Sequence, residues 1–155
     1  MEVQALQALA EEAYTFNGDR DRIYLTGLSL GGFGVWPLAM RHPGRFAAVV
    51  PVCGWVTQPE DDIPPSETAL YNKGNPVAGH PSPFTAAARL VGSIPTWVFH
   101  GDNDQAVSVE QSRNMVDAMK AAGGNVHYTE YEGMGHNVWD RAYGDSALMS
   151  WLLEQ

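Results

Sequence analysis

Short apolar runs alternate with longer amphipathic segments along most of the chain. Four runs have the length of buried strands, at residues 22–26, 46–52, 96–100 and 126–131. Helix-like segments lie between and around these runs. They are residues 3–14, the stretch that follows the glycine-dense residues 27–34 and ends at residue 40, residues 109–122 and residues 146–153. Continuous apolar strands that alternate with helices are typical of parallel βα units, with helices on both faces of the sheet. The pattern therefore predicts an α/β fold with a mainly parallel sheet of about four strands.

One region interrupts this alternation. Residues 55–91 hold six of the ten prolines and the acidic trio Glu60-Asp61-Asp62. We expect this region to be a long irregular excursion over the carboxyl edge of the sheet, where loops that contact ligands lie. The 155 residues are the length of one ordinary domain and show no internal repeat, so residues 1–155 are expected to form a single domain.

Composition and charge narrow the possible functions. Apolar residues are 45% of the 155 and charged residues 17%, which fits a globular protein and excludes a disordered tail. The formal net charge of −9 argues against nucleic acid as a partner, because proteins that bind phosphate backbones carry a basic surface. The apolar runs are much shorter than the ~20 residues of a membrane-spanning helix. No secretory leader is visible, so the expected location is cytoplasmic.

The single cysteine, Cys53, also limits the chemistry. One thiol excludes an internal disulfide and any metal cage built from several thiolates. We expect Cys53, at the end of a predicted buried strand, to be a small core residue. No cofactor is expected.

The strongest local motif is Gly27-Leu28-Ser29-Leu30-Gly31, between a predicted strand and a predicted helix. A serine on such a sharp turn is pushed into the open, and flanking glycines let neighbouring backbone approach closely. Ser29 is therefore the predicted nucleophile. The backbone N–H groups of Leu30 and Gly31 are placed to bind a developing oxyanion. The alternative is a glycine-rich turn with an incidental serine.

Two other glycine-loop functions do not fit these residues. A phosphate-binding P-loop needs lysine directly after its last glycine, but Phe33 follows Gly32. A dinucleotide-binding loop needs a third glycine where this chain has Pro37. Nucleotide binding by this turn is therefore excluded.

A serine nucleophile needs a base to take its proton and an acid to orient that base. His136 is the predicted base, because a glycine-containing loop after the fourth apolar run leaves it free to reach Ser29. Asp104 and Asp102, after the third run, compete for the role of the acid, and Asp102 could instead brace the loop through backbone amides. Metal binding by His100, Asp102 and Asp104 would need further ligands, so no metal is expected. The remaining histidines are expected to be structural or solvated: His42, His80, His100 and His127.

These motifs together resemble the α/β-hydrolase superfamily. They comprise residues 27–32, His42-Pro43 with Phe46-Ala47-Ala48, residues 97–104, and Gly135-His136-Asn137 with Trp139. The sequence looks most like carboxylesterase/phospholipase and dienelactone-hydrolase-like esterases, including "predicted peptidase" and feruloyl-esterase-like groups. The resemblance implies that the final aspartate of the H-G-x-x-D segment, Asp104, is the acid and that His136 is the base.

The sequence departs from that resemblance at three places. Ala106 stands where many relatives have proline, and Pro37 falls inside the helix after the nucleophile. In the family, several strands and an H-G loop that supplies a second oxyanion amide precede the segment that begins here at Met1. The expected fold is therefore a minimal α/β-hydrolase fold that lacks the N-terminal part of the usual one. The exposed side of strand 22–26 is expected to be buried by self-association as a homodimer, or by residues 3–14 and the excursion.

The resemblance implies a serine carboxylesterase that hydrolyses short-chain, small-molecule esters through an acyl-enzyme intermediate. From position alone, the acyl pocket is expected to involve Trp55 and Val107, with contributions around Tyr71 and Phe84. The same residues could cleave peptides or thioesters. The alternative from a different class is a truncated hydrolase fragment that acts as a scaffold or subunit without turnover.

Overall fold

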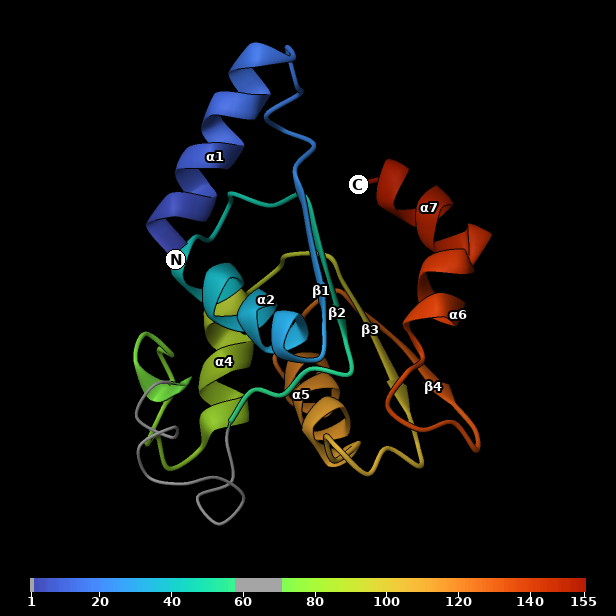
Figure 1. The fold of residues 1–155 in the computed structure, drawn as a ribbon. Helices are drawn as coiled ribbons and strands as arrows, with labels where there is room; N and C mark the ends of the chain where they lie inside the picture. Colours follow the sequence, from blue (N-terminus) through green and yellow to red (C-terminus); the bar gives the residue numbers. More distant parts are fainter. Residues whose placement is uncertain (1, 58–70) are drawn as a thin grey trace.

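A computed structural model describes residues 2–57 and 71–155 of the chain (Figure 1). Its centre is a four-stranded sheet in the order β1-β2-β3-β4, in which every neighbouring pair is parallel. The strands are β1 (Tyr24–Leu28), β2 (Ala48–Val52), β3 (Thr96–Gly101) and β4 (Val126–Tyr131). The predicted α/β fold with a parallel sheet is confirmed.

The four apolar runs became the four strands, with one shift that affects the site. The first strand begins at Tyr24 rather than at residue 22 and continues to Leu28, directly before the serine. Leu28 lies opposite Val52, and Val52 lies opposite Phe99, so neighbouring strands end side by side. The loops after β1, β2 and β3 therefore leave the sheet at one common edge.

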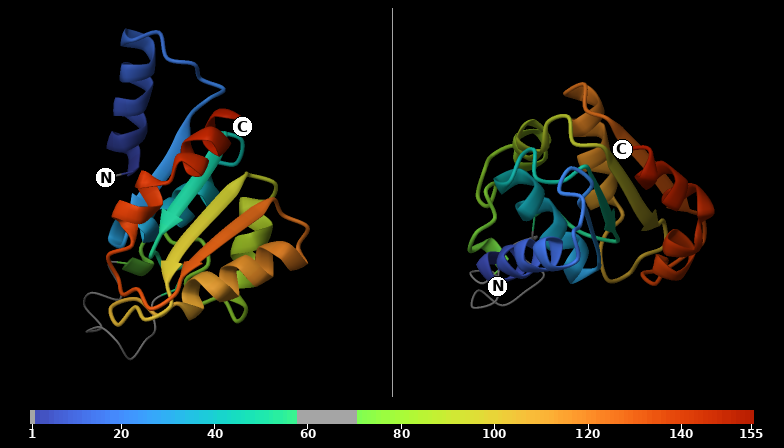
Figure 2. Two further views of the ribbon diagram at one scale, coloured as in Figure 1. Left: turned by 90° about the vertical axis from the view of Figure 1, so that its right-hand side faces the viewer. Right: turned by 90° about the horizontal axis from the view of Figure 1, so that it is seen from above.

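Helices lie on both faces of this sheet (Figure 2). The first face carries α2 (Leu30–Arg41), α4 (Pro83–Val91) and α5 (Glu110–Ala121), and the second carries α6 (Trp139–Gly144) and α7 (Ser146–Leu153). Successive residues of a strand point to opposite faces, so neighbouring valines of β2 enter two different cores. The first core includes Val49, Trp36, Met115 and Met119, and the second includes Val50, Phe99, Val138 and Leu148.

The irregular excursion predicted for residues 55–91 is wrong in its last part, because Pro83–Val91 form helix α4. Pro83 occupies the first turn of that helix, where a missing backbone N–H breaks no helical hydrogen bond. Its buried residues, Ala87, Ala88 and Val91, recur at helical spacing against α5 and α2. A proline-rich stretch can therefore contain the start of a helix. The part of the predicted excursion at residues 58–70 lies outside the described residues.

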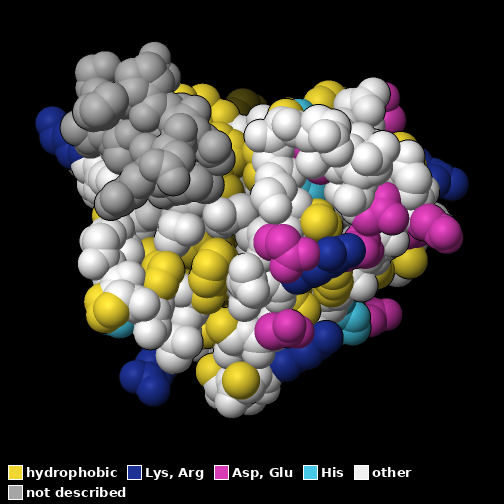
Figure 3. All heavy atoms as spheres, turned by 90° about the horizontal axis from the view of Figure 1, so that it is seen from below, with side chains coloured by type: hydrophobic (Ala, Val, Ile, Leu, Met, Phe, Trp, Pro, Cys, Tyr) yellow, Lys and Arg dark blue, Asp and Glu magenta, His cyan; other side chains and the backbone are white. Residues whose placement is uncertain are grey.

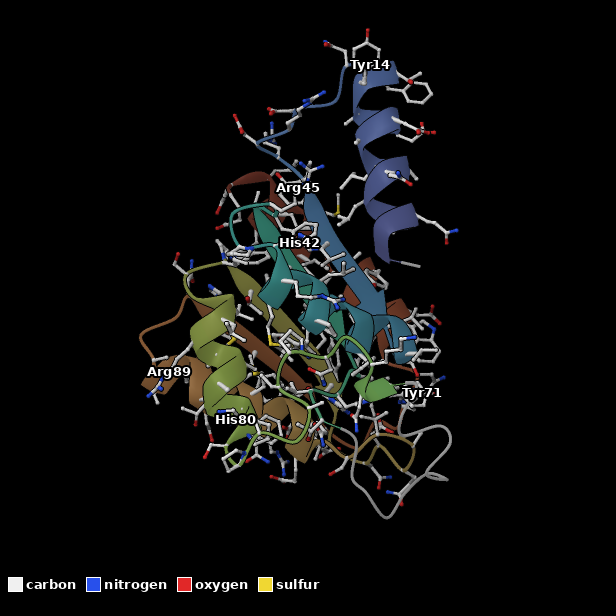
Figure 4. The ribbon with its side chains drawn as sticks, turned by 90° about the vertical axis from the view of Figure 1, so that its left-hand side faces the viewer. Tyr14, His42, Arg45, Tyr71, His80 and Arg89 are labelled. Atoms are coloured by element: carbon white, nitrogen blue, oxygen red, sulfur yellow. The ribbon has the colours of Figure 1, made fainter. Side chains whose placement is uncertain are left out.

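Helix α1 (Glu2–Thr15) forms as predicted, and its Leu6 and Leu9 pack against the first core. Its far end projects away from the sheet, with Tyr14 at its tip 81% exposed (Figure 4). Within the described residues, β1 is an edge strand of the sheet. Thr26 of β1 is in hydrogen-bond contact with Tyr143 of α6, while Leu28 stays 38% exposed. No helix in the described part of the chain is both long and apolar enough to cross a membrane.

Candidate active site

Ser29 occupies the tight turn between β1 and α2. Its φ of 53° and ψ of −117° lie in a region that non-glycine residues rarely adopt and that costs conformational energy. The Ser29 N–H donates to the carbonyl of Val52 at 2.9 Å, which extends the β1–β2 pairing into the turn. The sheet therefore holds the strained serine at the carboxyl edge, as the motif predicts.

Glycines let the backbones around this turn touch one another. A Cβ at Gly27 would overlap the backbone of Gly31, whereas a Cβ at Gly31 would meet no described residue within 4 Å. A Cβ at Gly32 would lie 2.8 Å from the Val52 carbonyl and 2.9 Å from the Cα of Gly54. The start of α2 thus rests directly on the end of β2. Gly54, which the sequence analysis did not single out, is part of this contact.

A chain of hydrogen bonds joins Ser29, His136 and Asp104. His136 Nδ1 lies 2.7 Å from Asp104 Oδ2, and His136 Nε2 lies 2.8 Å from Ser29 Oγ. A carboxylate only accepts hydrogen bonds, so Nδ1 carries a proton and donates it to Asp104. In the neutral ring Nε2 is then an acceptor and receives the Ser29 hydroxyl. The three side chains that the sequence predicted for nucleophile, base and acid lie together in the order that proton transfer requires.

Asp104 is buried and its carboxylate has several donors. Oδ1 accepts the backbone N–H groups of Ala106 at 2.8 Å and Val107 at 2.9 Å, and Oδ2 accepts from His136. Burial pushes the pKa of Asp104 upward, but these hydrogen bonds from Val107, His136 and Ala106 outweigh it and hold the pKa below its usual value. Asp104 is therefore an anion at neutral pH, suited to orient an imidazole.

The competing carboxylate, Asp102, points elsewhere. Its Oδ1 accepts the backbone N–H of Gly133 at 2.7 Å, which ties the loop after β3 to the loop after β4. Between the same loops, a Cβ at Gly101 would overlap the carbonyl oxygens of Met134 and Gly135. Asp102 thus has the bracing contact that the sequence left open for it, and Gly101 lets the His136 loop lie against the end of β3.

His100 was expected to be structural or solvated, and the structure places it fully buried behind Asp104. Its Nε2 lies 3.1 Å from Asp104 Oδ2 and 3.0 Å from the Val107 carbonyl. Its Nδ1 lies 2.7 Å from the hydroxyl of Ser112, which is itself buried in α5. The four-residue separation of His100 and Asp104 at a strand end is the one signal that could have linked them.

The predicted oxyanion donors begin helix α2. The first N–H groups of a helix have no partner within the helix, and those of Leu30 and Gly31 directly follow Ser29. The helix N-terminus adds partial positive charge at the same place. The arrangement can therefore stabilise negative charge next to the Ser29 hydroxyl.

Aromatic residues gather beside α2 close to its start. Phe33 stacks on Trp55 with ring centroids 5.1 Å apart, and Tyr71 meets both rings edge-on. Among the described residues, the buried indole N–H of Trp55 has no hydrogen-bond partner. Val107, the other predicted pocket residue, follows the Asp104 loop and is half-buried. Phe84 instead joins the first core from α4.

One group of side chains has the spacing of metal ligands, and it contains Cys53 in place of the Asp102 considered from the sequence. Atoms of Cys53, His100 and Asp104 lie within 4.8 Å of one another, whereas Asp102 is not part of the group. Burial raises the pKa of the Cys53 thiol to about 11, so it is protonated at neutral pH. The nitrogen of His100 that faces the group also carries a proton, because its two neighbours are acceptors. These donors therefore do not fit a bound metal, which needs a deprotonated thiol and a free imidazole nitrogen.

Residues 3–155 match the family model of the prolyl oligopeptidase family. The chain belongs to the prolyl oligopeptidase family. This family places it in the α/β-hydrolase superfamily, as the motifs predicted, although the prolyl oligopeptidase group itself was not among those the motifs suggested.

Individual proteins share sequence or fold with this chain. A thermostable esterase of known structure is 31% identical, with a TM-score of 0.74, over 99% of this chain and 36% of its own. An acylaminoacyl peptidase from Pyrococcus horikoshii shares the fold at 20% identity and a TM-score of 0.70, over 90% of this chain and 24% of its own. Non-reducing polyketide synthase Preu3 from Preussia isomera is 33% identical over 78 residues, which are 48% of this chain and 3% of that protein. The chain thus spans about a third of the esterase and smaller fractions of the others.

Proposed function

We propose that this chain carries the catalytic residues of a serine hydrolase that cleaves carboxylic esters. The observation that carries the proposal is the continuous contact from Ser29 through His136 to Asp104, with distances of 2.8 and 2.7 Å. Nucleophile, base and acid in this order are the recurring machinery of acyl transfer. The strained serine turn and the helix N-terminus beside it support the same reaction.

In the proposed first half-reaction, Ser29 Oγ attacks the ester carbonyl while His136 Nε2 takes the hydroxyl proton. The negative charge that develops on the carbonyl oxygen is bound by the N–H groups of Leu30 and Gly31. The imidazolium formed at His136 is stabilised by the Asp104 carboxylate, which stays ionised. When the ester bond breaks, His136 returns the proton to the departing alcohol, and the acyl group remains on Ser29.

In the second half-reaction, water attacks the acyl carbonyl and loses its proton to His136 Nε2. The tetrahedral intermediate collapses, the carboxylic acid leaves, and His136 returns the proton to Ser29 Oγ. No cofactor takes part in either step. The second half-reaction regenerates the starting hydrogen-bond chain.

Two observations favour a small ester as substrate. The structural neighbour at 31% identity is an esterase, while the peptidase neighbour at 20% identity supports the fold alone. Trp55, with Phe33 and Tyr71, supplies an apolar aromatic wall near the start of α2, and Val107 follows the acid loop. We assign Trp55 and Val107 to the acyl pocket and expect short acyl chains to be preferred.

The test is hydrolysis of p-nitrophenyl acetate by the wild-type chain and by Ser29→Ala. The expected result is turnover in the wild type that falls by at least ~1,000-fold in the variant, because the nucleophile is gone. N-acetyl-alanine p-nitroanilide as a second substrate measures peptide-type cleavage by the same serine. Turnover that survives Ser29→Ala would overturn the assignment, and absence of turnover in both proteins would favour a scaffold or subunit role.

We also propose that the chain self-associates through the outer edge of β1. The edge strand carries the exposed Leu28, and unpaired strand edges are templates for pairing with another chain. Light scattering coupled to size exclusion is expected to give a dimer mass that falls to a monomer mass in Leu28→Lys, where a charge replaces the exposed leucine of the edge strand. A monomer in the wild type contradicts this proposal.

A further inference from the structure

The loop that carries the candidate acid contains a second imidazole. We infer that His100 is a positioning residue of the proposed hydrolase site, which holds Oδ2 of Asp104 in line with His136. His100 is fully buried and contacts the same carboxylate oxygen as His136, at 3.1 Å against 2.7 Å. This inference rests on the proposed function and adds a role that the sequence did not assign.

The contacts of the His100 ring fix which nitrogen carries its proton. Nε2 faces two acceptors, the Asp104 carboxylate and the Val107 carbonyl at 3.0 Å, so Nε2 is protonated and donates to both. Nδ1 then accepts the Ser112 hydroxyl at 2.7 Å. Burial lowers the pKa of His100, which keeps the ring neutral. A neutral donor in one fixed tautomer is thus directed at Asp104 from the interior.

The effect on Asp104 follows from counting the bonds to its two oxygens. Oδ1 is held by the N–H groups of Ala106 and Val107, and Oδ2 by two imidazoles. The backbone donors fix only Oδ1, and by themselves they leave the carboxylate group free to rotate about that oxygen. The His100 bond fixes the second oxygen, so that Oδ2 meets Nδ1 of His136 in one orientation.

Neutrality matters for this role. A cation in the place of His100 would compete with the His136 imidazolium for the same carboxylate, whereas an uncharged N–H directs the oxygen and leaves its charge available. The other titratable groups around His100 are uncharged or placed differently, and one of them, the protonated thiol of Cys53, also interacts with Asp104. They are Cys53 at the end of β2, Glu130 opposite it on β4, and His136 itself.

A purely structural histidine would satisfy buried polar groups without affecting catalysis, and amide variants separate the two roles. Gln places its amide nitrogen near the position of Nε2, so His100→Gln keeps a donor for Asp104. Asn reaches only the position of Nδ1, so His100→Asn leaves Asp104 without that donor. Ser112→Ala is the matched control, because it removes the other hydrogen bond of the same buried ring and leaves the donor to Asp104 in place.

The experiment measures kcat and KM of the wild type and the three variants with p-nitrophenyl acetate. The enzyme concentration used for kcat is the concentration of Ser29 that reacts with a phosphonate. We expect kcat of His100→Asn to fall about 10-fold to 100-fold, the range for lost partners that orient a functional histidine at metal sites. KM should stay within about twofold, because His100 does not border the Ser29 hydroxyl. His100→Gln and Ser112→Ala should stay within about threefold of wild-type kcat.

A spectroscopic readout tests the same inference without turnover. The proton between His136 Nδ1 and Asp104 Oδ2 should give a low-field proton resonance in the wild type, His100→Gln and Ser112→Ala, and this resonance should be lost or broadened in folded His100→Asn. A wild type that has this resonance but no turnover would refute the proposed function and leave the positioning role supported. Two results would overturn the positioning role: an unchanged kcat and resonance in His100→Asn, or losses in His100→Gln and Ser112→Ala as large as the loss in His100→Asn.

Discussion

Two carboxylates in this molecule, Asp104 and Glu130, have pKa values below the usual range, and their surroundings are opposite. Asp104 is buried at the carboxyl edge of the sheet and is held by backbone N–H groups and two imidazoles. Glu130 lies on the exposed side of β4, where it accepts from Arg113 at 2.9 and 2.7 Å and from the Tyr128 hydroxyl at 2.6 Å. The guanidinium of Arg113 lowers the pKa of Glu130 to about 2.

The difference shows that the length of a hydrogen bond does not by itself decide how much it contributes to stability or activity. The bonds to Glu130 are as short as those to Asp104, but water and salt screen an exposed ion pair and can replace either partner. A buried carboxylate has no such substitute, so water does not replace a donor that is lost from it. Figure 3, which looks onto the carboxyl edge, shows oppositely charged side chains side by side on the surface. We expect those surface pairs to be replaceable and the Asp104 contacts to be essential.

The largest expected effect comes from changing each carboxylate to its amide. Asp104→Asn keeps the size of the side chain but removes the charge that orients His136, so kcat/KM should fall by about 10⁴-fold, as at other serine–histidine–aspartate sites. Glu130→Gln is the matched control and should change kcat/KM by less than about twofold. Ester kinetics with both variants, checked for folding by circular dichroism, measure the contrast. Equal losses in the two variants would remove the distinction between the regions.

The next effect concerns the backbone contacts that hold the site. Gly101→Ala would drive a Cβ into the carbonyls of Met134 and Gly135, so we expect it to destabilise the fold by about 1–3 kcal/mol and to lower kcat by displacing the His136 loop. Gly34→Ala, inside α2, adds a Cβ that meets nothing within 4 Å in the described part of the chain, so it should stabilise the fold by about 0.5–1 kcal/mol. Urea unfolding of the two variants measures the change in the free energy of unfolding, which should be a decrease for Gly101→Ala and an increase for Gly34→Ala. A stable, fully active Gly101→Ala variant would show that the two loops are not in close contact.

The regular part of this structure follows from residue patterns, whereas part of the site does not. Continuous apolar runs located the strands, and the Gly27–Gly31 motif located the strained serine between β1 and α2. Proline spacing did not locate helix α4, because proline at a helix start and proline in a loop look alike in sequence.

The role of His100 needed three-dimensional information. A histidine at a strand end has no sequence signal for burial, and its partner Ser112 belongs to a different helix. The same holds for Gly101, whose importance lies in a contact with a loop more than thirty residues later. Sequence patterns therefore identified the reacting groups, and the fold added the residues that hold them.

The smallest expected effect is the pH dependence of the exposed pair. The pKa of Glu130 is lower in the folded chain than its ordinary value of 4.5, so its contribution to stability is present above pH 4.5 and disappears as the pH falls toward about 2. The free energy of unfolding should therefore differ between wild type and Glu130→Gln by less than about 1 kcal/mol at pH 7, after allowance for solvent screening. The difference should shrink below pH 4.5. A difference that grows on acidification contradicts the assigned ion pair.

The proposed function depends most directly on Ser29 as a nucleophile that is activated by His136, which the buried Asp104 carboxylate orients. Treatment with a fluorophosphonate, followed by mass spectrometry of the digested protein, measures this without a choice of substrate. The predicted result is one adduct, on Ser29, that forms at least ~100-fold more slowly in His136→Gln and at an unchanged rate in Glu130→Gln. An adduct on another residue, or equal labelling rates in wild type and His136→Gln, would contradict the account.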